Sequence, residues 1–225
     1  MRVLAVSFTL SFALLVTQPS FGQALLVNST SNSPTDDQSS EVTFYAMGDV
    51  PYAQNEDELL PKQIEKLPSD GRFLIHLGDI KDGASACNEE VYIKVSSMLR
   101  KANSPTFIIP GDNEWNDCTT PDVAWKYWVK HFRNFDTNWE YDFTVSRQKV
   151  RNENFAFRLH GVLFAGINLV GGRVHDETEW KLRHAQNVAW LESLLKDNHG
   201  SYQAFVLFGH AHPVERHHDF FKPFV

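Results

Sequence analysis

The stretch Phe73-Leu-Ile-His-Leu-Gly-Asp-Ile-Lys-Asp-Gly83 decides the fold of this chain. Five mostly apolar residues lead into Gly78-Asp79, and a polar loop then closes on a second glycine. A short apolar run bounded by glycine is typical of a buried strand, and glycine lets the backbone turn sharply where the strand ends. Asp79 is therefore predicted at the carboxyl end of a strand, where open α/β sheets bind their ligands.

The same pattern occurs at three other places, where apolar runs end in Gly48-Asp49, Gly111-Asp112 and Gly209-His210. A single Gly-Asp pair is most often just a turn, but turns alone do not require this regular placement at strand ends. Four strands would thus deliver three carboxylates and an imidazole to one rim, and divalent metals bind these donors. The sequence predicts a metal site made of Asp49, Asp79, Asp112 and His210.

Length and composition fit one globular domain, with 225 residues of which 42% are hydrophobic and 22% charged. The formal net charge is −7 and no run of Lys and Arg forms a basic stripe. Because contacts to phosphate supply most of the affinity for nucleic acid, a nucleic-acid partner is not expected.

The chain is predicted to be exported. Met1-Arg2 precedes an apolar run from Val3 to Val16, and cleavage after Gly22 would leave small residues, Ser20 and Gly22, at both recognition positions, which is the layout of a secretory signal peptide. The run is too short for a permanent membrane span, so no membrane contact is expected after cleavage. We predict a signal peptide over 1–22, a flexible leader over 23–40 and a folded domain over 41–225. The expected location is extracellular or an endomembrane lumen, or the periplasm in a bacterial host.

Export gives the two cysteines a role. Cys87 and Cys118 both fall in loops that leave the predicted rim. In an oxidising compartment we expect them to form a disulfide, and the alternative is two unrelated thiols.

Apolar spacing predicts the remaining elements. Helices are expected over 56–67 and around 91–99, between the first three strands, and this βαβαβ pattern implies a parallel sheet. The aromatic stretch 124–135 is interpreted as core rather than as a carbohydrate-binding surface. Residues 154–168 predict a hairpin that turns at Gly161 in a second sheet, and residues 182–196 predict a helix.

Four further histidines are not expected to bind metal. His76 lies inside its strand and is predicted to be packed, and His160 is placed at the surface beside the hairpin turn. His217 and His218 are predicted to lie in a solvated loop.

The chain carries, in order, Gly48-Asp49, Gly78-Asp79 with Gly83, Gly111-Asp112-Asn113-Glu114 and Gly209-His210. From about Val42 onward, this set resembles the calcineurin-like metallophosphoesterases, the family that includes purple acid phosphatases. The resemblance implies an α/β fold in which a two-sheet β-sandwich is flanked by helices (αββα). It also implies hydrolysis of phosphate mono- or diesters with two metal ions, drawn from iron, zinc and manganese.

The resemblance also implies a role for each site residue. Asp49 would bind one metal and Asp79 would bridge both, while Asp112 and His210 would bind the second. Asn113 is the catalytic candidate, because its amide can donate a hydrogen bond to a phosphate oxygen.

Three features depart from the family pattern. Pro51 stands where the first motif usually has histidine, which leaves the phenol of Tyr52 as a candidate ligand. Asn113 stands in place of a histidine and cannot perform its acid–base work. His212 follows His210 as in the family's closing Gly-His-x-His motif, but its position suits the preceding motif. His212 is therefore a candidate for metal or substrate contact, and the chain is expected to lack the last strands and one or two histidine ligands.

Two classes of function follow. The first is a secreted metal-dependent phosphoesterase. The alternative is a non-catalytic relative that keeps the fold and a metal as a binding or structural module. A secreted carbohydrate-binding protein that uses the aromatic stretch 124–135 has little support.

The first prediction concerns processing. Because signal peptidases cleave after small residues, the mature amino terminus is expected close to Gln23. Intact-mass measurement of the exported protein checks this expectation, and secreted material that retains Met1 would contradict it.

Overall fold

The computed structural model describes residues 4–9 and 41–224, and within them the chain has a mixed α/β fold with two four-stranded sheets. The predicted cleavage point and the leader over 23–40 lie outside the described residues. The strands are β1 Leu4–Thr9, β2 Glu41–Met47, β3 Leu74–His76, β4 Thr106–Ile108, β5 Val145–Arg147, β6 Phe155–Leu159, β7 Val162–Val170 and β8 Ala204–His210. The helices are α1 Gln54–Glu65, α2 Glu89–Leu99, α3 Pro121–Phe132, α4 Glu177–Asp197 and α5 His218–Phe224, with 3₁₀ turns η1 Phe135–Asn138 and η2 Glu215–His217.

The first sheet has the order β1-β2-β3-β4, and β2, β3 and β4 are parallel as predicted. α1 and α2 are the connections between them, which confirms the βαβαβ pattern. β1 pairs antiparallel with β2 and lies inside the range predicted to be a signal peptide. Cleavage after Gly22 would remove β1 and leave the outer edge of β2 without this partner, so processing stays a prediction.

The second sheet has the order β5-β6-β7-β8. Its β6–β7 hairpin turns at Gly161, as predicted, and β8 pairs parallel with β7. His210 at the end of β8 therefore comes from a different sheet than the three carboxylates. The short elements β5 and α5 were not predicted.

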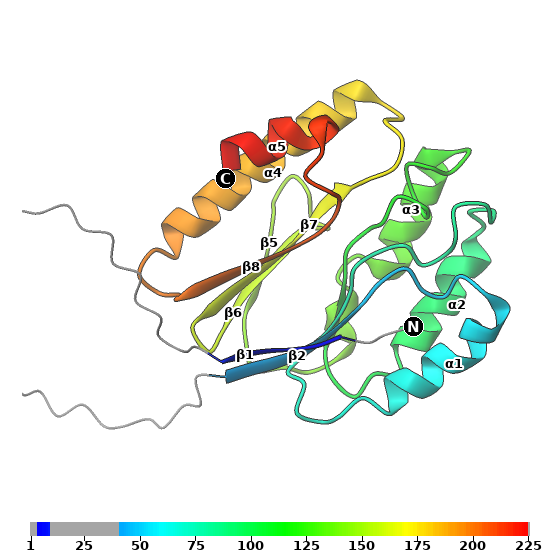
Figure 1. Cartoon of the computed structure of the whole chain (residues 1–225), viewed down its shortest axis with the longest axis horizontal. Helices are drawn as coiled ribbons and strands as arrows, with labels where there is room; N and C mark the ends of the chain where they lie inside the picture. The colour runs from blue at the N-terminus through cyan, green and yellow to red at the C-terminus, as the bar shows by residue number, and fades with distance from the viewer. Residues whose placement is uncertain (1–3, 10–40, 225) are drawn as a thin grey trace, which may run out of the picture.

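Helices and sheets form layers (Figure 1), and the three larger apolar clusters of the described residues lie between them. α1, α2 and α3 cover one face of the first sheet, and α4 and α5 cover the outer face of the second. Between the two sheets lies a core rich in phenylalanine from β2 and β6–β8 and from the segments around β3 and β4. This middle core fixes the two sheets relative to each other.

The aromatic residues of α3 and η1 belong to the core, as interpreted from the sequence. Trp128, Phe132 and Phe135 are buried against α2 and the first sheet, and Trp125 and Tyr127 pack on them while partly buried. This burial removes the support for a carbohydrate-binding surface built on these rings. α4 also forms where a helix was predicted, although it begins earlier, at Glu177, because the side chain of Asp176 caps its first turn.

The second prediction tests the core between the sheets. Phe73 is fully buried there, with its ring stacked on Phe44 at 4.8 Å between centroids and edge-on to Phe157 and Phe164 at 5.1 Å each. Phe73→Ala should lower the free energy of unfolding by about 3–5 kcal/mol, because it leaves a cavity in a closely packed core. Urea denaturation measures this loss. Val150→Ala, at a side chain that is 67% exposed, is the control and should change stability by less than about 0.5 kcal/mol; equal losses in the two variants would contradict the prediction.

Candidate metal centre

Asp49 and Asp79 lie in the turns after β2 and β3, and both adopt the left-handed backbone conformation, with φ of 58° and 59°. Residues other than glycine rarely occupy this region, although aspartate tolerates it better than most. Such conformations cost free energy and concentrate at functional sites. The two turns are also joined, since the amide of Asp49 donates to the carbonyl of Gly78 at 3.1 Å.

Two glycines allow the turns after β3 and β4 to touch. A Cβ on Gly111 would lie 2.2 Å from both the backbone nitrogen and Oδ1 of Asp79, and a Cβ on Gly78 would lie 2.5 Å from the nitrogen of Gly111. A side chain at either position would push the turns apart. Glycine therefore places the carboxylate of Asp79 against the loop that carries Asp112 and Asn113.

The two oxygens of Asp79 share Asn113 as a partner and differ in their second neighbour. Oδ1 accepts the backbone amide of Asn113 at 3.0 Å and lies 3.5 Å from Nε2 of His210. Oδ2 accepts the hydroxyl of Tyr52 at 2.8 Å and the side-chain amide of Asn113 at 2.6 Å. A carboxylate whose oxygens point to two sides can hold two partners at once.

His210 is oriented by its own backbone contact. Its Nδ1 lies 2.7 Å from the carbonyl oxygen of Leu77, so Nδ1 carries the proton and donates. Nε2 then points at the carboxylates, 3.1 Å from Oδ1 of Asp112 and 3.5 Å from Oδ1 of Asp79. A hydrogen bond on the far ring nitrogen is how proteins orient histidines that bind metals.

The charges in this cluster compensate one another. Burial alone would lower the pKa of His210, but Asp112 and Asp79 outweigh it and raise that pKa to about 9. Burial alone would raise the pKa of Asp112, but its contact with His210 holds it below the usual value. The pKa of Asp79 is raised, chiefly by burial. Without a metal, a proton on His210 thus offsets part of the negative charge.

Tyr52 bridges the first two carboxylates. Its hydroxyl lies 3.1 Å from Oδ1 of Asp49 and 2.8 Å from Oδ2 of Asp79. Partial burial and the hydrogen bond to Asp79 raise the pKa of Tyr52 well above its usual value. In this arrangement the phenol is a neutral donor, and it would act as a phenolate ligand only against a strong positive charge.

The structure brings the predicted site residues together. Asp49, Asp79 and His210 each offer a ligand atom within 4.8 Å of the others, and no other such group of three or more is found among the described side chains. A cavity of about 470 Å³ opens beside them. Asp112 lines it, as does the exposed His212, while Asn113 reaches the cluster through its contacts with Asp79.

Sequence reasoning assigned no role to Glu114, which is completely buried beside the cluster. Oε1 accepts the amide of Gly111 at 2.7 Å, and Oε2 has no hydrogen-bond partner. Burial first, and then the charge of Asp79, raise the pKa of Glu114 to about 7. Its place in the Gly-Asp-Asn-Glu motif was the available signal.

Lys81 and the disulfide restrain the loop that carries Asn113. The ammonium group of buried Lys81 donates to the carbonyls of Asn113 at 2.8 Å and Asp82 at 2.6 Å. The predicted disulfide between Cys87 and Cys118 is confirmed, with 6.0 Å between their Cα atoms, and it lies against the same Asn113 carbonyl. No sequence pattern pointed to Lys81.

The disulfide indicates a non-reducing compartment. Within the described part of the chain, no helix combines the length and the apolar character needed to cross a membrane. Secretion itself stays a prediction.

The other histidines met different outcomes. His76 is buried, as predicted, with Nε2 lying 3.0 Å from the carbonyl oxygen of Val50. His160 is partly buried, and its Nε2 accepts from Arg72 at 3.2 Å. The prediction that His217 lies in a solvated loop is wrong, because η2 packs on α4 and buries its ring; His218 begins α5 and is partly buried.

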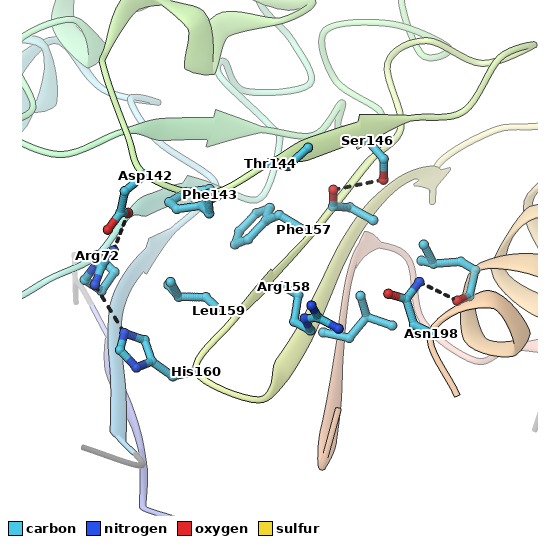
Figure 2. A pocket seen from close by; sticks show the side chains of 13 residues that line it. Arg72, Asp142, Phe143, Thr144, Ser146, Phe157, Arg158, Leu159, His160 and Asn198 are labelled. Atoms are coloured by element: carbon cyan, nitrogen blue, oxygen red, sulfur yellow. Dashed lines mark hydrogen bonds and ion pairs between the residues drawn. The ribbon is translucent and has the colours of Figure 1, made fainter. Parts of the chain in front are cut away.

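Another cavity, of about 460 Å³, lies away from this cluster, and Figure 2 shows its lining. Arg72, which lines it, pairs with Asp142 at 2.6 Å and contacts His160. Because Arg72 precedes β3 and Asp79 follows it, the two cavities lie at opposite ends of that strand. None of the predicted metal ligands lines this second cavity.

The chain was compared with known proteins. No protein-family model matches it, and no curated protein sequence matches it significantly.

The third prediction is that the cluster binds a divalent cation. Mn²⁺ or Zn²⁺ should raise the melting temperature, because a ligand at 100 times its dissociation constant adds about 2.7 kcal/mol to the free energy of unfolding. Thermal denaturation with and without metal measures the shift. His210→Gln should lose most of it, whereas His199→Gln, at an exposed position after α4, should keep it. No shift in the unsubstituted protein with manganese, zinc, iron or calcium would contradict a metal site here.

Proposed function

We propose that this protein is a metal-dependent phosphoesterase that hydrolyses phosphate mono- or diesters through a two-metal site, in an αββα sandwich of the metallophosphoesterase type. One observation carries the proposal. The carboxylates of Asp49 and Asp79 and the imidazole of His210 each offer a ligand atom within 4.8 Å of the others, and Asp112 lies 3.1 Å from His210 beside the same cavity. The placement of the ligands at strand ends and the order of the motifs also support this function. We further propose that the protein is exported to an oxidising compartment.

The residues present fit a divalent metal. Asp49, Asp79 and Asp112 supply oxygen donors and His210 supplies a nitrogen whose orientation is already set by Leu77. Carboxylate oxygen and imidazole nitrogen suit iron, zinc and manganese. The mutual repulsion of the carboxylates also favours a cation; in its absence His210, Tyr52 and Asn113 offset part of their charge.

Each residue has a role in this proposal. Asp79 would bridge two ions, because one of its oxygens lies near His210 and the other accepts from Tyr52; Asp49 would hold one ion, and Asp112 with His210 the other. When bound, such ions polarise phosphoryl oxygens and lower the pKa of water.

The polar side chains would bind and orient the phosphate. The side-chain amide of Asn113, which now donates to Asp79, would donate to a phosphate oxygen, and it cannot transfer a proton. The neutral phenol of Tyr52 offers a second donor. His212 is exposed on the cavity lining, where it can contact the part of the substrate that leaves.

A non-catalytic relative is the second candidate, and specific observations favour it. Pro51 and Asn113 replace two histidines of the family pattern, so His210 is the single imidazole in the cluster of ligand atoms among the described residues. Tyr52 and Asn113 also form hydrogen bonds across the carboxylates, which would have to rearrange when metal enters. Such a protein would bind metal without turnover.

The fourth prediction separates the two candidates. Asp79→Asn keeps the size and most of the hydrogen bonding of the side chain but removes the charge that would bridge two ions. We expect it to abolish phosphoesterase activity and to weaken metal binding. Hydrolysis of p-nitrophenyl phosphate and bis(p-nitrophenyl) phosphate with added Mn²⁺ or Zn²⁺ measures the first, and thermal shift the second.

Asp82→Asn is the matched control, three residues along the same loop. The carboxylate of Asp82 accepts the amides of Ala84 and Ser85 and does not reach the cluster. The Asp82→Asn variant should therefore keep most of the phosphoesterase activity. Equal activity in the two folded variants would remove Asp79 from the site, and metal binding without any hydrolysis in the unsubstituted protein would favour the non-catalytic relative.

A further inference from the structure

The segment after β8 folds back onto α4 and is held there by two kinds of contact. Phe220 in α5 is completely buried against Leu191 of α4 and against the outer face of the second sheet. Beside this apolar contact, polar side chains of η2 and α5 meet α4. Figure 1 shows α5 lying along α4.

A chain of three titratable groups joins these elements. Oδ1 of Asp219 in α5 lies 2.5 Å from Nδ1 of His184 in α4, and Nε2 of His184 lies 3.3 Å from Nδ1 of His217 in η2. Both rings are buried. The spacing assigns the protons: Nδ1 of His184 donates to the carboxylate, and Nδ1 of His217 donates to the free nitrogen of His184. A further proton on Nε2 of His184 would therefore face the N–H of His217.

The surroundings disfavour a charge on either ring. His184 and His217 face Arg183 and Glu179 of α4, Arg216 of η2 and Asp219 of α5. Burial is the largest effect and lowers the pKa of both histidines, that of His217 to about 4. The carboxylate of Asp219 acts in the opposite direction and raises the pKa of both histidines, but its side chain is 45% exposed and water screens its charge.

The same segment reaches the candidate metal centre through Arg216. Its carbonyl accepts from the indole of Trp180 at 3.2 Å, and its guanidinium donates to the carbonyl of Gly172. The turn formed by Gly171 and Gly172 lies against two predicted ligands. The amide of Gly171 donates to the carbonyl of His210 at 2.7 Å, and a Cβ on Gly172 would lie 2.6 Å from Oδ2 of Asp112.

We propose that Asp219, His184 and His217 form an acid-sensitive latch. At neutral pH the uncharged histidines dock η2 and α5 on α4, and Arg216 then holds the turn of Gly171 and Gly172 against the cluster of carboxylates. In acid, protonation of the pair releases η2 and α5 and frees that turn. The latch is a regulatory device beyond the proposed phosphoesterase activity, and its test does not require that activity.

The direction of the pH dependence follows from the docked state. A histidine with a pKa near 6.5 when free and about 4 when docked favours docking fully above pH 6.5. The favourable contribution is lost as the pH falls from 6.5 towards 4. For His217 alone, docking should weaken roughly 30-fold between pH 7.5 and pH 5.

Hydrogen exchange tests the latch in the full chain. Amide protection factors over residues 215–224, corrected for the pH dependence of intrinsic exchange, should fall roughly 30-fold from pH 7.5 to pH 5. Those in the middle of α2, packed on the other sheet, should not. Equal protection of residues 215–224 at the two pH values in the unsubstituted protein would overturn the proposal, whatever the variants do.

Two variants separate the histidines from the arginine. His217→Phe keeps a ring against Trp180 but cannot take up a proton, so most of the pH response of residues 215–224 should disappear. Arg216→Ala should lower the protection of the Gly171 amide at pH 7.5 and leave α5 protected. A full pH response in folded His217→Phe, or unchanged Gly171 protection in Arg216→Ala, would contradict the latch.

Discussion

At Gly78 and Gly111 the turns after β3 and β4 approach so closely that neither position has room for a Cβ. This approach puts the carboxylate of Asp79 within reach of the Asn113 amide and of His210. Asp79 also has a left-handed backbone conformation, which costs free energy. The contacts with the neighbouring turns offset this cost. The close approach of these two turns therefore places the carboxylate around which the other candidate ligands lie.

Electrostatics then decides what the cluster can hold. Buried carboxylates repel one another and lose hydration, so they require compensating charge or donors. Here the compensation comes from a protonated His210, a neutral Tyr52 and the amide of Asn113. Nε2 of His210 can bind a metal only after it has lost its proton, so metal affinity and proton release are linked.

Much of the site was predictable because its signals are local. A short apolar run before Gly-Asp specifies both a strand and the place of its carboxylate, so Asp49, Asp79 and Asp112 could be positioned from sequence alone. The sheet that carries His210 could not, since strand order depends on pairing between distant segments. His217 was misplaced for a similar reason: the polar stretch around it resembles a loop, and only packing on α4 buries its ring.

Because His210 belongs to one sheet and the carboxylates to the other, the distance between them depends on the core between the sheets. That core consists largely of stacked and edge-on phenylalanine rings such as Phe44, Phe73 and Phe164, which resist small shifts because interiors are closely packed. Lys81 and the disulfide restrain the Asn113 loop at the rim. The candidate metal centre is therefore a property of the whole fold: a peptide that carried any one motif would lack the partner sheet that completes the set of candidate ligands.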